Sequence, residues 1–466
     1  TTEIYTLSLH DALPICRISG VDADRAPVAA GSKGARRKAD LIIAKFLSSF
    51  TPYFDAVVQF RPLPHDEGQL LERTLCGRKL TTEDPAVVDG ECGEPERAVA
   101  VLLNGNFNHS LDIQGLLEEL KPALNRRSRV VAVIYNPYLR GLYRVANALG
   151  LRKGPPPTTF VTRRDVEALA LLSGYEVVNL RLCNFPPGRL TGVGQRLDSF
   201  LAALPLVRWL ALSCVVTLRP ILPEAGRPGL SVVIPARNER GNIEAALKRM
   251  PELGCPLEII FVEGHSSDGT WEEIERVRAE YGDRYRILSA QQRGKGKADA
   301  VRLGFSMATQ PLLTILDADL TMPPERLGRY YEAYAAGLGD FINGSRLVYP
   351  MEGEAMRFLN LLGNIFFAKA LSYVLGVPLG DSLCGTKFLS RKDYERMVAW
   401  RRDFGDFDPF GDFELLFPAA LLRLGIVNLP IRYLDRTYGS TNISRFRHGF
   451  QLLRMVLVGL VRIKLK

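Results

Sequence analysis

The chain has 466 residues, of which 47% are hydrophobic and 24% are charged, and it contains 41 glycines and 29 prolines. This composition is typical of folded globular proteins, and it excludes the disordered, collagen-like and multi-spanning membrane classes. The length allows two or three domains whose cores need no disulfides or metals for stability. Lysine and arginine number 60 against 51 aspartates and glutamates, which indicates an anionic partner such as a nucleotide, a phospholipid or a nucleic acid.

The segment TTEIYTLSLHDALPI, residues 1–15, differs from the rest of the chain. It resembles a translated sequencing adapter, and the alternative is a frayed natural N-terminus, so we interpret residues 1–16 as a non-native leader. We expect no secretory signal. The seven cysteines are scattered without a CxxC pair, which predicts a reducing, cytoplasmic compartment. Prolines and arginines interrupt the apolar stretch 200–222, so we expect it to be buried core and not a membrane span.

Strands and helices alternate clearly from Ala98 onward. Apolar runs predict the strands, and apolar residues at three- and four-residue spacing predict the helices. Thr162 is expected to cap a helix that stops at Gly174. The other predicted elements are strands at 98–105, 129–137 and 175–182 and a helix at 111–124. This alternation predicts an α/β fold with mostly parallel, doubly wound sheets.

A linker that contains proline and glycine, residues 223–229, divides the chain into two modules. The first module covers residues 17–222 and the second covers residues 230–442. Residues 443–466 are predicted to form a basic amphipathic helix at the C-terminus. The two modules do not resemble each other, and the sequence has no internal repeat of fixed period.

The segment 98–182 is similar to the C-terminal half of class I S-adenosylmethionine-dependent methyltransferases. LLNGNFNHSLDIQGLLEEL and VTRRDVEALALLSGYEVV look like a strand–helix pair and a helix–strand pair of that fold. Cofactor binding there needs a glycine-rich turn after the first strand, and residues 17–97 contain no predicted strand followed by GxGxG. The resemblance therefore implies an incomplete Rossmann-like module without methyl transfer. His109 and Asp112 could border such a site, but a cap or surface role is favoured.

In the second module, polar side chains follow three successive predicted strands. LSVVIPARNE (230–239) runs into a turn, LEIIFVEGHSSDGT (257–270) ends in acidic and small residues, and PLLTILDADLTMPP (311–324) ends in two aspartates. Ligands of open parallel sheets bind outside the carboxyl ends of the strands. We therefore expect these side chains to gather at one edge of the sheet.

The residue types at this edge suit a nucleotide diphosphate. Asp317 and Asp319 could hold a divalent cation, because Mg²⁺ prefers oxygen ligands and keeps few protein contacts. Glu263 and Asp268 could accept hydrogen bonds from a base and a ribose. The basic loop and helix QQRGKGKADAVRLGF (291–305) could face a pyrophosphate. Each of these motifs by itself is more often a solvated turn than a binding site. Their order on successive strands, however, favours a nucleotide-binding site.

The order of these motifs resembles family 2 glycosyltransferases with a GT-A fold, over about residues 229–450. VVIPARNE, FVEGHSSDGT and DAD match the first nucleotide-binding strand, the acidic loop and the metal-binding DxD motif. Glu263 stands where the family usually has aspartate. This difference leaves open whether the donor nucleotide carries uracil or guanine. The resemblance implies Mg²⁺ or Mn²⁺ on Asp317 and Asp319. It also implies a GDP- or UDP-linked sugar bound by Pro235, Ala236, Asn238, Glu239, Glu263, Asp268, Lys295, Lys297 and Asp317.

Three later segments are similar to polyprenyl-phosphate sugar synthases of the dolichyl-phosphate mannose synthase type. They are DFINGSRL (340–347), GDSLCGTKFLSRKDY (380–394) and LPIRYLDRTYGSTNISRFRHG (429–449). The likeness implies basic and hydroxyl side chains around the diphosphate and the acceptor phosphate. In this sequence they are Arg346, Lys387, Arg436 and Ser440.

The resemblance implies a metal-dependent, inverting transfer of a hexose to a polyprenyl phosphate, with Arg436 as a catalytic residue. A lipid phosphate is already an anion, so basic residues that orient it could replace a strong base. The alternative is a saccharide or other hydroxyl acceptor, which needs a base. Asp412 is the candidate for that role, and a helix N-cap is the structural alternative for it. A third possibility is a non-catalytic nucleotide-binding or scaffold protein.

Two segments favour a membrane surface as a partner. Residues 356–379 are apolar with helical spacing, and residues 445–466 are apolar with interspersed arginine and lysine. A basic amphipathic helix suits the plane of an anionic membrane, which predicts a peripheral protein on the inner face of the cell membrane. The alternative is that both helices cover the sheet or pair in a dimer. No basic stripe interleaved with aromatics indicates nucleic-acid binding.

Overall fold

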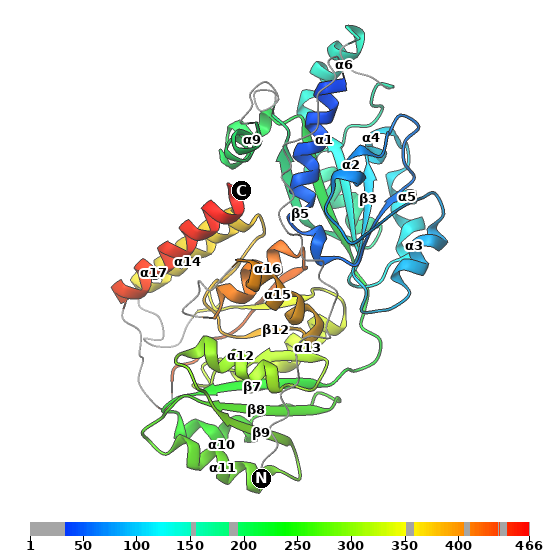
Figure 1. Ribbon diagram of the computed structural model, residues 1–466. Helices are drawn as coiled ribbons and strands as arrows, with labels where there is room; N and C mark the ends of the chain where they lie inside the picture. The colour runs from blue at the N-terminus through cyan, green and yellow to red at the C-terminus, as the bar shows by residue number, and fades with distance from the viewer. Residues whose placement is uncertain are drawn as a thin grey trace.

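The computed structural model describes residues 33–150, 155–185, 194–350, 358–404, 411–436, 438 and 445–465. These residues form two α/β units, one around a six-stranded sheet and one around a seven-stranded sheet. Figure 1 shows the first unit in blue to green and the second unit in green to red below it. The leader, residues 1–16, and Ser440 lie outside the described residues.

The first sheet has the strand order β2-β1-β3-β4-β6-β5. Strands β2, β1, β3 and β4 are parallel, whereas β6 is antiparallel to both of its neighbours. Because β5 is antiparallel to β6, it runs in the same direction as β4, so the prediction of a mostly parallel sheet holds for five of the six strands. The strands are β1 (Ala56–Phe60), β2 (Arg78–Thr82), β3 (Val99–Asn104), β4 (Arg129–Tyr135), β5 (Tyr175–Cys183) and β6 (Ser213–Pro220).

Helices of this unit begin and end largely where the sequence indicates. Thr162 and Asp165 form a capping box at the start of α7, and Gly174 adopts a left-handed conformation just after its end. Asp112 accepts a hydrogen bond from the Gly115 backbone N–H and so caps α5, which confirms the structural interpretation of this residue. The helices are α1 (Lys33–Leu47), α2 (Gln69–Arg73), α3 (Pro85–Cys92), α4 (Asn106–His109), α5 (Ile113–Leu120), α6 (Arg140–Ala148), α7 (Arg163–Leu172) and α9 (Gly194–Ala203).

The expectation that residues 200–222 form buried core is wrong for the first half of the stretch. Residues 213–220 form the buried strand β6, but Phe200, Leu206 and Leu210 are exposed. The reason is that this half lies on α9 and the 3-10 turn η4 (Val207–Leu210), at the surface of the unit and outside the sheet.

The second sheet has the order β13-β11-β12-β10-β7-β8-β9. All of its paired strands are parallel except β12, which is antiparallel to both β10 and β11. The apolar runs noted in the sequence form its central strands. The strands are β7 (Leu230–Ala236), β8 (Leu257–Glu263), β9 (Arg286–Gln291), β10 (Leu312–Ile315), β11 (Phe341–Ser345), β12 (Lys387–Ser390) and β13 (Ile426–Pro430).

Helices cover both faces of the second sheet (Figure 1). Apolar side chains of α10, α11 and α13 pack in one core cluster, and those of α12 and α14–α17 pack in another. The helices are α10 (Arg240–Lys248), α11 (Thr270–Tyr281), α12 (Lys297–Met307), α13 (Leu327–Ala335), α14 (Phe358–Leu375), α15 (Arg391–Phe404), α16 (Phe413–Leu421) and α17 (Arg445–Gly459).

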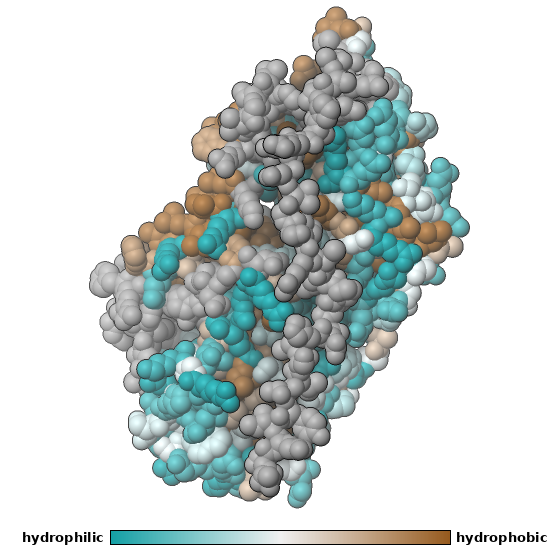
Figure 2. Space-filling view, viewed as in Figure 1, coloured by the Kyte–Doolittle hydropathy of each residue, from teal (hydrophilic) through white to brown (hydrophobic). Residues whose placement is uncertain are grey.

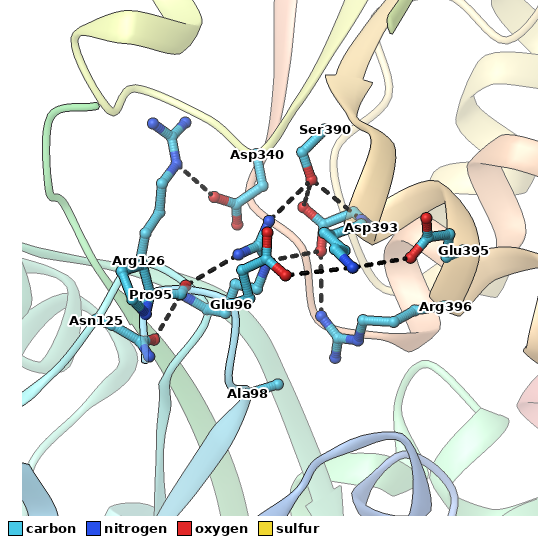
Figure 3. Close-up of polar contacts among 12 residues, drawn as sticks. Pro95, Glu96, Ala98, Asn125, Arg126, Asp340, Ser390, Asp393, Glu395 and Arg396 are labelled. Atoms are coloured by element: carbon cyan, nitrogen blue, oxygen red, sulfur yellow. Dashed lines mark hydrogen bonds and ion pairs between the residues drawn. The ribbon is translucent and has the colours of Figure 1, made fainter. Parts of the chain in front are cut away.

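A buried ion cluster joins the two units. Asp340, which precedes β11, accepts hydrogen bonds from Arg129 Nη2 at 2.6 Å and Arg219 Nη1 at 3.1 Å, both from the first unit. Arg126 Nε lies 3.4 Å from the same carboxylate, a contact shown in Figure 3. Burial raises the pKa of Asp340, but the three arginines outweigh burial and hold this pKa well below its usual value. The ionised carboxylate therefore links strands β4 and β6 to the second sheet.

Candidate functional site

The candidate site lies at the carboxyl edge of the second sheet. Strands β7, β8 and β10 are parallel and in register, so Ala236 pairs with Glu263, and Asp317 follows β10 two residues after its end. The side chains that follow these strands therefore come together at one edge, as the sequence predicts.

Two loops of this edge are held together by hydrogen bonds. Asn238, with φ 55°, accepts from the Ser267 backbone N–H at 2.9 Å and donates its own N–H to Ser266 Oγ at 2.9 Å. Asp268 accepts from the Arg240 N–H at 3.2 Å and the Thr270 N–H at 3.1 Å. These contacts fix the loops after β7 and β8 against each other.

Glu263 is buried beneath this pair of loops. Its carboxylate accepts from the Ser266 N–H and from Gln291 Nε2, the latter at 3.1 Å. Burial raises the pKa of Glu263, but these hydrogen bonds outweigh burial and lower it overall. Glu263 therefore stabilises the shape of the loop, which the sequence did not indicate. Lys295, by contrast, is exposed on the loop before α12.

Both aspartates of the DAD motif contact a cation. Asp317 forms an ion pair with Lys297, the first residue of α12. Burial raises the pKa of Asp317, but Lys297, Lys387 and Arg346 outweigh burial and lower it. Asp319 accepts from Thr321 Oγ1 at 2.8 Å with one oxygen and from Arg436 Nη2 at 2.6 Å with the other.

The donor set of this motif fits a divalent cation. The carboxylate oxygens of Asp317 and Asp319 already contact positive groups at this edge. Carboxylate oxygens are also the ligands that Mg²⁺ and Mn²⁺ prefer. Among the described residues, no group of three or more His, Cys, Asp or Glu side chains is placed to hold a metal.

Arg436 and Tyr438, which follow β13, contact the carboxylates of this edge. Arg436 Nη1 is also 3.7 Å from Glu239 Oε1, so the guanidinium bridges Glu239 and Asp319. Tyr438 donates its hydroxyl hydrogen to Asp268 at 3.2 Å. The structure thus brings together residues from three strand ends and from the chain after β13.

Lys387 and Asp412 form a second part of the site. Lys387 is buried on β12, and its Nζ lies 3.3 Å from Asp412 Oδ1. Asp412 occupies the N-cap position of α16, as the structural alternative predicts, but its side chain makes no capping hydrogen bond. The nearby Glu414 accepts from Arg302 at 2.7 Å and Arg401 at 2.9 Å and so serves the packing of α16.

Arg346 has a buried partner that sequence reasoning missed. Asp381 accepts two hydrogen bonds from the Arg346 guanidinium, at 2.7 and 3.0 Å, and is itself fully buried. Burial raises the pKa of Asp381, but Arg346 outweighs burial and lowers it. The only available signal was the acidic residue inside GDSLCGTKF, which by itself suggests no partner.

The second unit matches a known family. A family model described as glycosyl transferase family 2 matches residues 231–398. A dolichol-phosphate mannosyltransferase from Pyrococcus furiosus is 35% identical over 121 residues, which are 26% of this chain and 33% of that protein. A dolichyl-phosphate hexose transferase from Haloferax volcanii is 27% identical over 223 residues, 47% of this chain and 89% of that protein.

Among solved structures, a mannosyltransferase from Pyrobaculum calidifontis in complex with GDP-Man and Mn²⁺ aligns with 52% of this chain and 66% of its own. The two chains are 19% identical, with a TM-score of 0.35.

Residues 231–398 of the second unit therefore form a glycosyl transferase family 2 domain. The chain spans 33% of the length of the Pyrococcus relative and 89% of the Haloferax relative. None of the described helices is long and apolar enough to cross a bilayer.

Proposed function

We propose that this chain transfers a hexose from a GDP- or UDP-linked sugar to a polyprenyl phosphate, with Mg²⁺ or Mn²⁺ bound at a GT-A-type site. The observation that carries the proposal is the pair Asp317 and Asp319 at the strand edge, each in contact with a cation. Alternating carboxylates and cations suit a diphosphate with a bound metal ion, because the carboxylates can bind the metal and the cations can bind the phosphate oxygens.

The residues of the chain divide the work of binding. Asp317 and Asp319 would hold the metal, which when bound would neutralise charge on the leaving diphosphate. Lys297 and Arg436, released from these carboxylates, can donate hydrogen bonds to phosphate oxygens. The ordered loops of Asn238 and Asp268 would hold the nucleoside. A single displacement on the sugar would invert the anomeric carbon.

A phosphate acceptor agrees better with the geometry than a hydroxyl acceptor. Asp412, the candidate base, is engaged in an ion pair with the buried Lys387, so taking a proton would break that pair. A lipid phosphate needs no base and is attracted by cations. The names of the Pyrococcus and Haloferax relatives, which refer to dolichol and dolichyl phosphate, support the same choice.

The test is transfer of labelled sugar from a panel of nucleotide sugars, with Mg²⁺ or Mn²⁺ and with or without polyprenyl phosphate. Label in the organic phase that requires the lipid supports the proposal. Label only in a water-soluble product would favour a hydroxyl acceptor. No transfer under any condition, with nucleotide still bound, would favour the non-catalytic alternative.

We also propose that the protein docks peripherally on the inner face of the cell membrane. Figure 2 shows apolar side chains along the edge formed by α14 and α17. Phe366 is 58% exposed and Phe450 is 73% exposed, and Leu457 and Val461 continue the same face. Flotation with anionic vesicles tests this proposal, and absence of binding would refute it.

For the first unit we propose an incomplete methyltransferase-like fold without methyl transfer. Strand β1 is followed by Arg61 and Pro62, with no glycine-rich turn at the position where the cofactor would need one. Isothermal titration with S-adenosylmethionine tests the proposal, and micromolar binding would contradict it.

A further inference from the structure

A cavity of about 560 Å³ lies between the two units. Its first-unit wall includes Phe46 on α1, Arg181 on β5 and Trp209 on η4, and its second-unit wall includes Trp400 on α15 and Arg423 after α16. The volume is within the range of sites that bind small ligands. None of the candidate donor-site residues lines it, so the cavity is separate from the glycosyltransferase site.

The charges in this cavity are strongly unbalanced. Among the described residues that line it, the only acidic side chain is Asp198, which accepts a hydrogen bond from the Phe185 N–H at 2.7 Å. The cationic lining residues are Lys45, Arg163, Arg181, Arg208, Arg423, Arg462 and Lys464. Lys45, Arg163 and Arg462 are exposed, and Arg163 pairs with Glu167. The other four cations are partly or fully buried, and because buried cations are costly unless anions compensate them, these four point to an anionic ligand.

Arg423 is the most deeply buried of these cations. It is 3% exposed, and its Nε has no hydrogen-bond partner within the described part of the chain. Its guanidinium carbon lies 5.2 Å from the ring centre of Phe46 and 4.8 Å from that of Phe50, and one Nη is 3.4 Å from the Ala420 carbonyl oxygen. These contacts supply no negative charge. Burial lowers the pKa of Arg423, and the nearby Arg181 lowers it further.

Three other cations lie close to one another. Burial, Arg181 and Arg208 together lower the pKa of Lys464 to about 8. Arg181 faces the ring of Phe46 at 4.9 Å, and Nε of Arg208 is buried without a hydrogen-bond partner in the described chain. The group of Arg181, Arg208, Arg423 and Lys464, here called the cation cluster, therefore exceeds the charge of the single lining carboxylate, Asp198, which acts on Arg181.

Part of the remaining wall is apolar, although Asn136, Asn179 and Ser199 also line the cavity. Side chains of Ile42, Val166, Leu375 and Phe404 line the cavity beside the cation cluster. An anion with an attached hydrocarbon chain satisfies both surfaces at once, because the head group meets the cations and the chain meets the apolar wall.

We propose that this cavity binds the phosphate monoester of a long-chain lipid, the same chemical class as the proposed acceptor, at a second site that includes none of Arg346, Lys387 and Arg436. A phosphate monoester carries a charge of about −1.5 to −2 at pH 7, so it compensates the cation cluster better than a carboxylate with one charge. The guanidinium groups of Arg181 and Arg423 can donate paired hydrogen bonds to phosphate oxygens.

The experiment titrates the full-length protein with dodecyl phosphate below its micelle concentration and follows tryptophan fluorescence. Two of the three tryptophans, Trp209 and Trp400, line the cavity. We expect a saturable change in the wild type and affinity weaker by about tenfold or more in Arg423→Gln and in Lys464→Gln. The matched control is Lys248→Gln, which removes an exposed cation on α10 paired with Glu244 and should bind as the wild type does.

Two further ligands separate the possible sources of binding. Dodecanol that binds as tightly as dodecyl phosphate would overturn the role of the cation cluster. Inorganic phosphate that binds as tightly would overturn the role of the apolar wall. Should Arg423→Gln fail to fold, Ala202→Phe, which fills the cavity from α9, and Lys464→Gln decide the matter. Unchanged affinity in either variant would refute the proposal.

Discussion

Replacement of Asp340 by asparagine removes the one carboxylate that three arginines of the first unit share. Arg129 is 1% exposed and Arg219 is 0% exposed. Arg219 keeps Glu176 at 2.5 Å and Arg126 keeps Glu224 at 3.1 Å, whereas the closest remaining hydrogen bonds of Arg129 go to carbonyl oxygens. The loss therefore falls mainly on Arg129, which would become a buried charge without an ion-pair partner.

Breaking a buried pair by removing one partner typically costs about 3–5 kcal/mol. We expect Asp340→Asn to lower the free energy of unfolding by about 3 kcal/mol or more, which raises the unfolded fraction more than about a hundredfold. Urea unfolding, followed by circular dichroism, is the suitable assay, since guanidinium chloride would screen the ion pairs. The matched control is Glu332→Gln, which breaks an exposed pair with Arg227 and should change the free energy of unfolding far less than Asp340→Asn does.

The pH dependence gives a second measure of the same effect. In the folded state the pKa of Asp340 lies below its value of about 3.9 in an unfolded chain. Its ionised form therefore stabilises the fold fully above about pH 4, and this stabilisation is lost as the pH falls toward the folded-state pKa. The gap between wild type and Asp340→Asn should shrink below pH 4. A loss of less than about 1 kcal/mol at pH 7 would show that Asp340 does not couple the units.

Three further predictions concern the transferase site. Asp319→Asn should reduce sugar transfer by about a thousandfold without unfolding, and wild-type activity in this variant would refute its role as a metal ligand. Arg436→Ala frees Asp319, so Mn²⁺ titration should show tighter metal binding while transfer falls by at least about tenfold; weaker metal binding would contradict the role given to the Arg436 contact. Asp412→Asn should keep transfer to polyprenyl phosphate within about tenfold of wild type, whereas a loss above about a hundredfold would indicate that Asp412 is a base.

The sequence alone predicted the features that depend on neighbouring residues. Apolar runs followed by VVIPARNE, VEGHSSDGT and DAD located the strand ends of the second sheet, because strand pairing and turn formation follow local patterns. The capping of α5 by Asp112 and of α7 by Thr162 came from the same kind of signal. The same motifs also predicted the family of the domain at residues 231–398.

Only the tertiary structure decided which charged groups meet. Arg129 and Asp340 are 211 residues apart, Arg436 and Asp319 are 117 apart, and the walls of the cavity between the units come from both ends of the chain. Local sequence patterns do not predict such pairs, because the residues around a lysine or arginine do not indicate whether its side chain contacts water, a distant carboxylate or a cavity. The positive charges of the chain thus fall into particular groups, at a buried interface, at the carboxyl edge of the second sheet and in the cation cluster, only once the two sheets are packed together.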